Sequence, residues 1–419
     1  MSSADIPQPQ YARNMKLIAY SDQGGRPDGC QIMVDRGYAY VAHTFSTGFS
    51  VLDVRDPKNP KTIKYIPSPQ NSWNVHHQTG DGLLLIAQQK NLWAQPEFAD
   101  ERKYYQASAS DISSQASKRG QEATWSAGLV VYDISEAGNP RQIAFMPVSG
   151  SGLHRLWYTG GRWAYASALI EGFSDFIFIT IDMADPKRPF IAGRFWLPGM
   201  NLAAGEKPDW PTAGRFGCHH GIVSGDTAYV SWRDACLAIV DVKDRTAPKL
   251  IKHMMWSQNF GGATHTCVPL PDRDLLVVMD EATLDEMEDG YKPTWMFDIR
   301  DPAKPRCIST FPAPSDRNYV EVGGHFGPHN AHENRPGTLV SSELIFTTYQ
   351  NAGIRVYDIR NQYSPVEVGA LVPPPPARMM DTRPGKPLIL HSVDIFVDAN
   401  GIIYTTDLNA GFYIMEYTG

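Results

Sequence analysis

A repeated spacing between an acid and a proline is the feature that most constrains the fold of this chain. In six segments an apolar run ends in an aspartate, and a proline follows seven residues later each time. A seventh run, GFYIMEY, places Glu416 at the acid position. Self-similarity of this kind indicates a repeat architecture, in which every unit is one supersecondary structure. The six pairs are Asp53–Pro60, Asp133–Pro140, Asp182–Pro189, Asp241–Pro248, Asp298–Pro305 and Asp358–Pro365.

Each repeat has residues typical of four β-strands. The aspartate and the proline favour a tight turn between two strands, because aspartate can hydrogen-bond the backbone two residues on and proline fixes φ. A β-hairpin pattern such as SVDIFVDANGIIYTTD stands before this turn. Four strands in roughly 50 to 60 residues are typical of a propeller blade. The sequence therefore predicts an all-β fold, a single seven-bladed β-propeller over residues 1–419, and disfavours the alternative of two β-sandwiches.

The two ends of the chain are expected to share the seventh blade. The seventh repeat stops after its third strand, whereas the N-terminal segment MKLIAYSD resembles the fourth strands of the other repeats, such as PKTIKYIPSP. Pairing of the N- and C-terminal strands would close the ring and remove exposed sheet edges.

The repeat cores, such as LVVYDIS and LAIVDV, resemble the LVIVD-repeat family of β-propellers. The resemblance covers nearly the whole chain and implies the propeller fold, but it says little about activity. More distantly, the architecture is similar to that of the selenium-binding protein and methanethiol oxidase group, which are copper-dependent propellers with histidine ligands. No long motif is shared with that second group.

Charge and composition indicate which partners and which cellular location to expect. The formal net charge is −7 and basic residues form no long runs, so neither nucleic acid nor an anionic membrane is an expected partner. The N-terminal segment MSSADIPQPQYARNMK lacks the apolar region of a secretory signal, so we expect a cytoplasmic protein, with a trimmed exported precursor as the alternative. Five widely spaced cysteines without a CxxC pattern favour reduced thiols. The oligomeric state is left open.

Most of the 12 histidines stand just before the first hairpin of a repeat. In a propeller the innermost strands all begin on one face, and the loops after the second strands, which carry Arg233 and Glu281, return to that face. Side chains from distant repeats are therefore expected to meet at one end of the central channel. The histidines at these positions are His76, His77, His154, His219, His220, His265, His329, His332 and His391.

Recurrence of histidine in six of the seven repeats favours a shared site, although any one of them alone is more often a hydrogen-bonding partner of a loop. Imidazole ligands suit a divalent transition metal, with Zn, Fe or Mn expected and Cu possible, rather than Ca or Mg. Three or four imidazoles suffice for one ion. From their similar offsets to the hairpins we predict His154, His219, His265 and His391 as metal ligands. The predicted catalytic residues are His76, His77, His220, His329, His332 and Glu281.

Four long insertions, residues 89–127, 199–217, 314–335 and 373–390, fall on the same face as the histidines. Loops elaborated on one side of a rigid scaffold commonly build a binding site. The first insertion is expected to be a lid over the channel, with a short helix within residues 106–125. Aromatic and guanidinium side chains near these loops suit a small anionic or aromatic molecule. The predicted substrate-binding residues are Trp125, Arg155, Arg233, Phe326 and Arg378.

Three functions fit these features. The leading one is a metal-dependent hydrolase or lyase that acts on a small anionic or aromatic metabolite, in which the ion polarises the substrate or activates water. The second is a mononuclear iron or copper oxygenase or oxidase. The third is a propeller that serves as a non-enzymatic interaction scaffold. The chain has no P-loop, no GxGxxG after a strand and no GxSxG elbow, which disfavours nucleotide-dependent chemistry and a serine hydrolase.

Overall fold

The computed structural model describes residues 6–91, 100–105, 124–210, 214–257 and 260–419. Its strands group into two compact units. We name them the middle unit, residues 68–269 with 301–304, and the flanking unit, residues 1–67, 270–300 and 305–419. The expected single domain stays a prediction. None of the helices among the described residues is long and apolar enough to cross a membrane.

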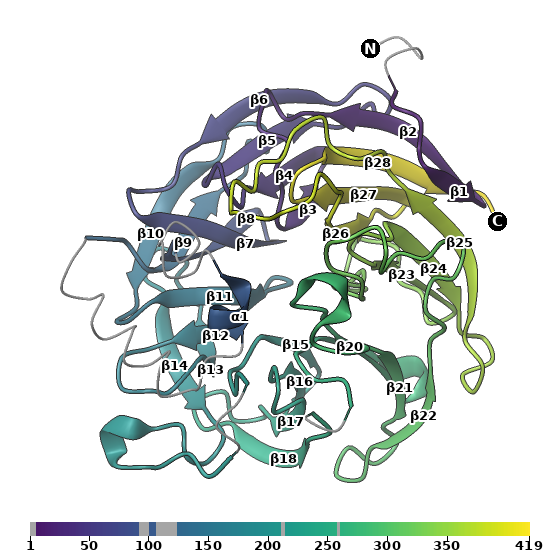
Figure 1. Cartoon of the computed structure of the whole chain (residues 1–419). Coiled ribbons are helices and arrows are strands. Elements are labelled where there is room, and N and C mark those ends of the chain that lie inside the picture. The colour runs from purple at the N-terminus through teal and green to yellow at the C-terminus, as the bar shows by residue number, and fades with distance from the viewer. Residues whose placement is uncertain (1–5, 92–99, 106–123, 211–213, 258–259) are drawn as a thin grey trace. The chain divides into compact units, whose positions relative to one another are not determined.

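The middle unit consists of four-stranded antiparallel sheets, each made from strands consecutive in the sequence (Figure 1). A single pairing, Gly152 with Gln89, joins the first two of these sheets. The strand β19 (Thr264–Leu270) follows the third sheet. The sheets are β7 (Ser72–Gly80), β8 (Leu83–Lys90), β9 (Gly128–Asp133) and β10 (Arg141–Pro147); β11 (Gly152–Trp157), β12 (Trp163–Leu169), β13 (Ile177–Asp182) and β14 (Phe190–Phe195); and β15 (His220–Ser224), β16 (Thr227–Ser231), β17 (Leu237–Asp241) and β18 (Lys249–Met254).

The flanking unit is built in the same way, and two of its sheets take a strand from the N-terminal segment. These two additions are β1 (Tyr11–Arg13), which pairs with β25, and β2 (Met15–Ser21), which pairs with β28. The other strands are β3 (Ile32–Asp35), β4 (Tyr38–Ala42), β5 (Phe49–Asp53) and β6 (Lys61–Ile66); β20 (Leu275–Asp280), β21 (Thr294–Asp298) and β22 (Arg306–Thr310); β23 (Leu344–Thr348), β24 (Ile354–Asp358) and β25 (Val366–Val372); and β26 (Ser392–Val397), β27 (Ile402–Asp407) and β28 (Gly411–Tyr417).

In all six cases the repeated aspartate ends a strand, and its carboxylate caps the turn that leads to the next strand of the same sheet. Asp133 Oδ1, for example, accepts the backbone N–H of Ser135 at 2.8 Å. The other five aspartates accept the N–H two residues on at 2.8–3.1 Å. The turn predicted from the acid-to-proline spacing is therefore confirmed, and the sheets are consistent with seven blades.

Pairing of the two chain ends is also confirmed. Strand β2 runs antiparallel to β28, with Met15 opposite Tyr417 and Ser21 opposite Phe412. The sequence did not predict that β1 would complete the neighbouring sheet, because a three-residue strand carries no alternating pattern.

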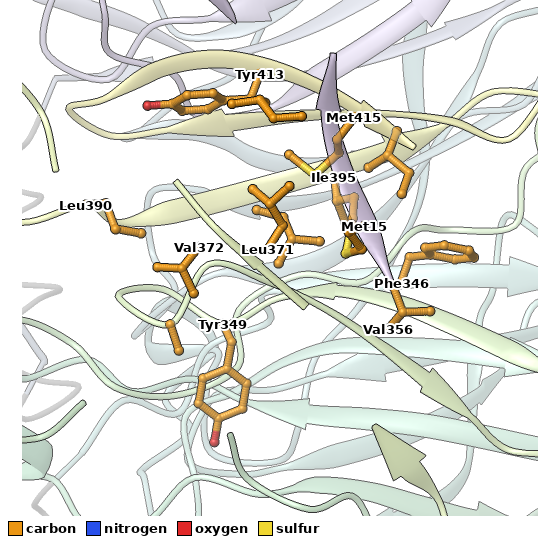
Figure 2. Close-up of a cluster of buried hydrophobic side chains, with 14 of the residues drawn as sticks. Met15, Phe346, Tyr349, Val356, Leu371, Val372, Leu390, Ile395, Tyr413 and Met415 are labelled. Carbon is orange, nitrogen blue, oxygen red and sulfur yellow. The ribbon is translucent and has the colours of Figure 1, made fainter. Parts of the chain in front are cut away.

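Apolar side chains from both of these sheets form one buried cluster (Figure 2). Met15 and Leu17 of β2 contribute to it from the N-terminus, and Met415 of β28 from the C-terminus. Phe326, which the sequence suggested as a substrate contact, belongs to this cluster and stacks on Tyr319 with ring centroids 5.8 Å apart. Its surroundings are those of a core residue.

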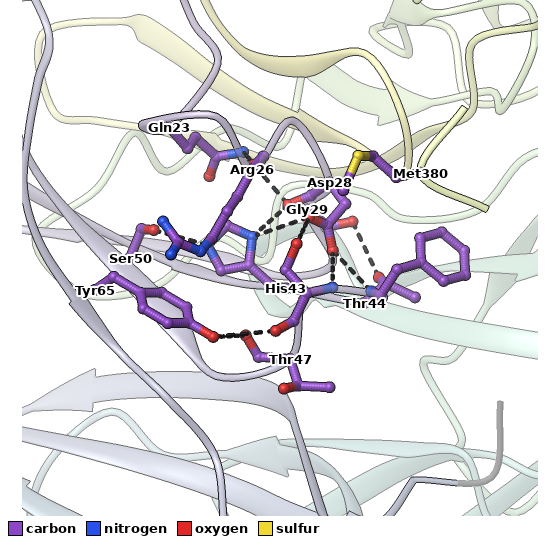
Figure 3. Close-up of polar contacts among 12 residues, drawn as sticks. Gln23, Arg26, Asp28, Gly29, His43, Thr44, Thr47, Ser50, Tyr65 and Met380 are labelled. Atoms are coloured by element: carbon purple, nitrogen blue, oxygen red, sulfur yellow. Dashed lines mark hydrogen bonds and ion pairs between the residues drawn. The ribbon is translucent and has the colours of Figure 1, made fainter. Parts of the chain in front are cut away.

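Some buried histidines of the flanking unit are fixed by polar contacts within the fold (Figure 3). The Nδ1 of His43 lies 2.5 Å from the Asp28 carbonyl, and its Nε2 lies 2.7 Å from Ser50 Oγ. The Asp28 carboxylate accepts the N–H groups of Phe45 and Ser46. Burial opposes the charge of Asp28, but these bonds and the nearby His43 hold its pKa below the usual value.

His332, a predicted catalytic residue, is likewise held by the backbone at both ring nitrogens. Its Nε2 lies 2.8 Å from the Leu339 carbonyl, and its Nδ1 accepts the N–H of Val397 at 3.1 Å. Burial lowers the pKa of His332 to about 4, with a smaller lowering from Arg335, whereas the bond to Leu339 acts in the opposite direction. The backbone thus engages both ring nitrogens of His332, and the catalytic role of this residue stays a prediction.

We predict that Leu17→Ala lowers the free energy of unfolding by about 2–5 kcal/mol, because it leaves a cavity in the cluster between the two sheets. The matched control is Lys16→Ala on the same strand, whose side chain is exposed and whose loss should change stability by less than about 0.5 kcal/mol. Urea titrations of both variants measure the difference. Equal losses of unfolding free energy in the two variants would show that β2 does not pack as described.

We predict that His332 makes the fold less stable in acid. The unfolded chain takes up a proton near the ordinary pKa of 6.5 and the folded chain only near 4, so stability falls as the pH drops through this window. Between about pH 7 and about pH 5 the expected loss is roughly 2 kcal/mol. In His332→Gln this part of the loss should vanish in urea titrations at the two pH values. An unchanged pH dependence would contradict the assignment.

Candidate functional site

Four predicted site residues of the middle unit lie close together, and we call them the histidine cluster: His76, His154, His219 and His265. The Nε2 atoms of His154 and His219 are 3.1 Å apart. The ring centroids of His219 and His265 are 4.0 Å apart, and those of His76 and His154 are 4.9 Å apart. His219 and His265 are buried. The cluster brings together three of the four predicted metal ligands.

Neighbouring first strands create the cluster. His76 lies in β7, His154 in β11 and His265 in β19, while His219 directly precedes β15. Strand β11 contacts both β7 and β15, so equivalent positions of successive repeats come side by side. Neighbouring residues of an extended chain point to opposite sides. In His219–His220 the first ring joins the cluster, while His220 Nε2 lies 3.1 Å from the Leu156 carbonyl.

The hydrogen bonds of His219 present its Nε2 to His154. Its Nδ1 lies 2.7 Å from the His265 carbonyl, to which it donates its proton. The same carbonyl accepts the hydroxyl of Ser231 at 2.6 Å. Because Nδ1 carries the proton, Nε2 has a lone pair directed at the cluster. Histidines that bind metals are commonly oriented by a backbone carbonyl in this way.

The geometry of His154 and His219 fits two ligands of one metal ion. Two nitrogens that each lie about 2.0–2.1 Å from a tetrahedral ion are roughly 3.3 Å apart. The observed separation of 3.1 Å is close to this value. Gln89 Nε2 lies 3.3 Å from His154 Nδ1, so the second nitrogen of His154 also has a polar neighbour.

Burial and positive charge keep His76, His154 and His219 neutral. Burial is the main reason that the pKa values of His76, His154 and His219 lie well below the usual value. The charge of Arg233 is the next cause for His154 and His219, and that of Arg155 for His76. A neutral imidazole is the form that binds a metal ion.

Arg155, Arg215 and Arg233 are buried near this cluster. Arg215 forms an ion pair with Asp175 through two bonds of 3.0 and 2.7 Å. Arg155 and Arg233 were predicted to bind substrate, whereas the pairing of Arg215 with Asp175 was not foreseen. The two residues lie 40 positions apart on loops without a shared pattern.

The first insertion contributes a short helix, α1 (Glu101–Tyr105), labelled in Figure 1. Tyr104 lies over the Arg215 guanidinium at 4.7 Å, and Tyr105 lies over that of Arg233 at 5.9 Å. The helix expected within residues 106–125 falls largely outside the described residues. Sequence reasoning did not select either tyrosine, because neither belongs to a repeat.

The flanking unit holds a second group of histidines. His329 Nδ1 lies 2.5 Å from the Val393 carbonyl, and its Nε2 lies 3.5 Å from Glu281 Oε1. The ring centroid of His391, the fourth predicted ligand, is 6.3 Å from that of His329 and 4.9 Å from that of His325. His325 Nε2 lies 3.3 Å from Asp285 Oδ1. Imidazole and carboxylate groups that could bind a metal thus occur near one another in this unit too.

Three other predicted residues are not members of the histidine cluster. His77 is fully buried in β7, on a strand position that alternates with His76. Trp125 donates its indole N–H to the Gly150 carbonyl at 3.2 Å and carries the Lys90 ammonium over its ring. Arg378 is exposed and donates to the Gly25 carbonyl at 3.3 Å. Their functional roles stay predictions.

Comparison with known proteins supports the fold. The LVIVD repeat model matches residues 28–64 and 222–255. No curated protein matches the chain at a significant level. The β-propeller domain of Cps50 (Swd1) from Myceliophteria thermophila is 10% identical, with a TM-score of 0.53 over 97% of this chain and 100% of that one. A protein from Lactobacillus plantarum is 11% identical, with a TM-score of 0.54 over 86% of this chain and 87% of that one.

Likeness at such low identity shows the fold alone. It agrees with the antiparallel four-stranded sheets. The resemblance read from the repeat cores is confirmed by the two matched segments. The chain is a β-propeller that carries LVIVD repeats.

Proposed function

We propose that the chain is a metal-dependent enzyme whose histidine cluster binds one divalent transition metal. The observation that carries this proposal is the pair of Nε2 atoms of His154 and His219, 3.1 Å apart, with the other nitrogen of His219 bound to a backbone carbonyl. The same separation is that of an N–H···N hydrogen bond, so the pair would bind one ion when both Nε2 atoms present their lone pairs. His265 is the third ligand that we propose, because its ring lies against that of His219.

The donor set favours Zn, Fe or Mn, with Cu also possible. All three proposed ligands are imidazoles, and no carboxylate is among them. Burial and nearby arginines lower the pKa values of His154 and His219 and keep these two rings neutral. A shell of neutral nitrogen ligands suits these metals better than Ca or Mg, which take oxygen ligands. His391 belongs to the flanking unit, and its role as a ligand stays a separate prediction.

The reaction that we propose is hydrolysis or elimination on a small anionic metabolite. When bound, the metal would supply a Lewis acid that polarises a carbonyl or lowers the pKa of water. Arg155 and Arg233 would stabilise negative charge on the substrate as the reaction proceeds, since buried guanidinium groups favour anions. His76, whose ring meets that of His154, is the proposed proton acceptor because it is an imidazole beside a proposed ligand.

A redox function is the second candidate. The same neutral imidazole set can hold iron or copper, so an oxygenase or oxidase would use the same residues as ligands. An interaction scaffold without a metal is the third candidate. The identity of the bound metal separates these possibilities.

We predict that His154→Ala and His219→Ala each abolish metal binding and leave the fold intact. Each change removes one of the two facing Nε2 atoms. The matched control is His253→Ala, because His253 lies outside the cluster and its Nε2 contacts the Ala235 carbonyl. Elemental analysis of protein purified without a histidine tag measures the metal content, and circular dichroism reports the fold. Full metal content in both cluster variants would show that other residues bind the ion.

We predict that a chelator destabilises the wild-type protein and has no effect on His219→Ala. A ligand that binds only the folded state stabilises it by about 2.7 kcal/mol at a hundredfold excess over Kd. Stoichiometric zinc or manganese would support hydrolysis or elimination, and stoichiometric iron or copper would support oxidation. Wild-type protein with no bound metal and no response to chelator would rule out both enzyme functions.

A further inference from the structure

Gln89 is a buried amide that contacts a proposed metal ligand. The residue is 2% exposed, and its Nε2 lies 3.3 Å from His154 Nδ1. Its Oε1 is buried and has no hydrogen-bond partner in the part of the chain that the structure describes. Buried polar atoms without a partner are rare in folded proteins, and each calls for an explanation. The hydrogen bonds around His154 supply one for Gln89.

The backbone fixes Gln89 beside His154. Gln89 lies in β8, where it pairs with Trp73 of β7 on one side and with Gly152 of β11 on the other. Gly152 has a φ of 105°, and a Cβ at this position would come within 2.5 Å of the Gln88 carbonyl oxygen. Glycine therefore permits the close approach of the two strands. Because His154 follows Gly152 by two residues on the same strand, the amide of Gln89 reaches its ring.

The position of the His154 proton follows from this contact. An amide N–H₂ group has donors and no lone pair, so the Nδ1 atom that faces it must accept. The ring is then neutral and carries its proton on Nε2, since an imidazolium has no acceptor. This proton points at His219 Nε2, 3.1 Å away. His219 Nε2 is an acceptor, because the Nδ1 of His219 donates to the His265 carbonyl.

In this arrangement the two histidines bind each other. The lone pair of His219 Nε2 receives the His154 proton, so neither nitrogen is available to an ion. A metal ion bound by both Nε2 atoms requires His154 to carry its proton on Nδ1 instead. That N–H would face the N–H₂ group of Gln89, and two donors do not form a hydrogen bond. Metal binding by His154 and His219 therefore requires a change at Gln89.

Rotation of the amide provides this change. The oxygen and nitrogen of a glutamine amide are nearly equal in size, and a half-turn of the terminal torsion exchanges them. With Oε1 toward His154, the amide accepts the Nδ1 proton, and both Nε2 atoms present lone pairs. The unpaired end of the amide lies at the same place in either orientation, so it does not select between them. A ligand that binds one of two states better shifts the population toward that state.

We infer that Gln89 is a positioning residue that determines which nitrogen of His154 carries the proton. With the amide nitrogen toward His154, the rings of His154 and His219 bind each other. With the amide oxygen toward His154, the two rings bind a metal ion. The inference rests on the proposed function for the ion, whereas the coupling between Gln89 and the His154 tautomer is also a property of the metal-free protein.

The histidine tautomers test this coupling directly. Nuclear magnetic resonance of protein with isotope-labelled histidine nitrogens distinguishes a protonated ring nitrogen from one with a lone pair. We expect metal-free wild type to carry the proton on Nε2 in His154 and on Nδ1 in His219, with the His154 signals identified by their loss in His154→Gln. Addition of Zn²⁺ should move the His154 proton to Nδ1 and leave that of His219 in place. A His154 ring protonated on Nδ1 before zinc is added would overturn the inference.

Two substitutions of Gln89 should differ in their effect on zinc binding. At about pH 8 the carboxylate of Gln89→Glu only accepts, so it should hold the His154 proton on Nδ1 and bind Zn²⁺ at least as tightly as the wild type. Gln89→Met keeps the side-chain length but cannot accept this proton, so Zn²⁺ should bind about tenfold or more weakly. Isothermal titration of the metal-free proteins with Zn²⁺ measures both affinities. Equal weakening in the two variants would show a packing role and overturn the inference.

Gln88→Met is the matched control. Gln88 is the neighbouring residue in β8, is as buried as Gln89, and forms its hydrogen bonds with Asn74 and Ser126 instead of a histidine. This variant should bind Zn²⁺ like the wild type. A loss of affinity equal to that of Gln89→Met would assign the effect to packing and overturn the inference. If Gln89→Met fails to fold by circular dichroism, the tautomers of the wild type and of Gln89→Glu carry the test.

The same measurements separate this inference from the metal proposal. If Gln89→Glu moves the His154 proton from Nε2 to Nδ1 while the wild type binds no zinc, the result would support the role of Gln89 and contradict the metal site. Zinc binding of equal strength in the wild type and in both variants of Gln89 would support the metal site and overturn the role of Gln89.

Discussion

The carboxylate cap that the repeated aspartates provide is the interaction on which the rest of the structure depends. Six aspartates accept the N–H two residues on, and each thereby turns the chain into the next strand of its sheet. Because the turn is the same each time, equivalent residues of successive repeats occupy equivalent positions. In the middle unit this regularity brings the starts of β7, β11 and β15 together, and with them His76, His154 and His219.

The chemistry of the cluster follows from burial combined with positive charge. Desolvation alone would keep these imidazoles neutral, and the arginines add to the effect. The same guanidinium groups that disfavour a protonated histidine favour a bound anion. The proposed site would bind a metal through neutral nitrogens and an anionic substrate through arginines, so one electrostatic environment would serve both.

The repeats and the pairing of the two chain ends were predictable because both follow from residue patterns that recur along the sequence. His154 and His219 were placed together correctly by their equal offsets, since the cluster depends on position within a repeat. Non-periodic contacts could not be read in this way. The Arg215–Asp175 pair and the tyrosines of α1 join loops with no common register. Sequence also does not tell which backbone groups need a buried partner, and for that reason the backbone contacts of His332 were not foreseen.

The same pair of hydrogen bonds orients one histidine in each unit. His219 Nδ1 binds the carbonyl of His265 in the next repeat, and Ser231 Oγ donates to that same carbonyl. In the flanking unit, His329 Nδ1 binds the carbonyl of Val393 in the next repeat, and Thr348 Oγ1 donates to it. The ring presents Nε2 in each case, but its partner differs: His154 for His219 and Glu281 for His329. The repeat therefore determines how the imidazole points, and the residue that it meets determines its chemistry. The imidazole partner of His219 is the arrangement on which the proposed metal site rests.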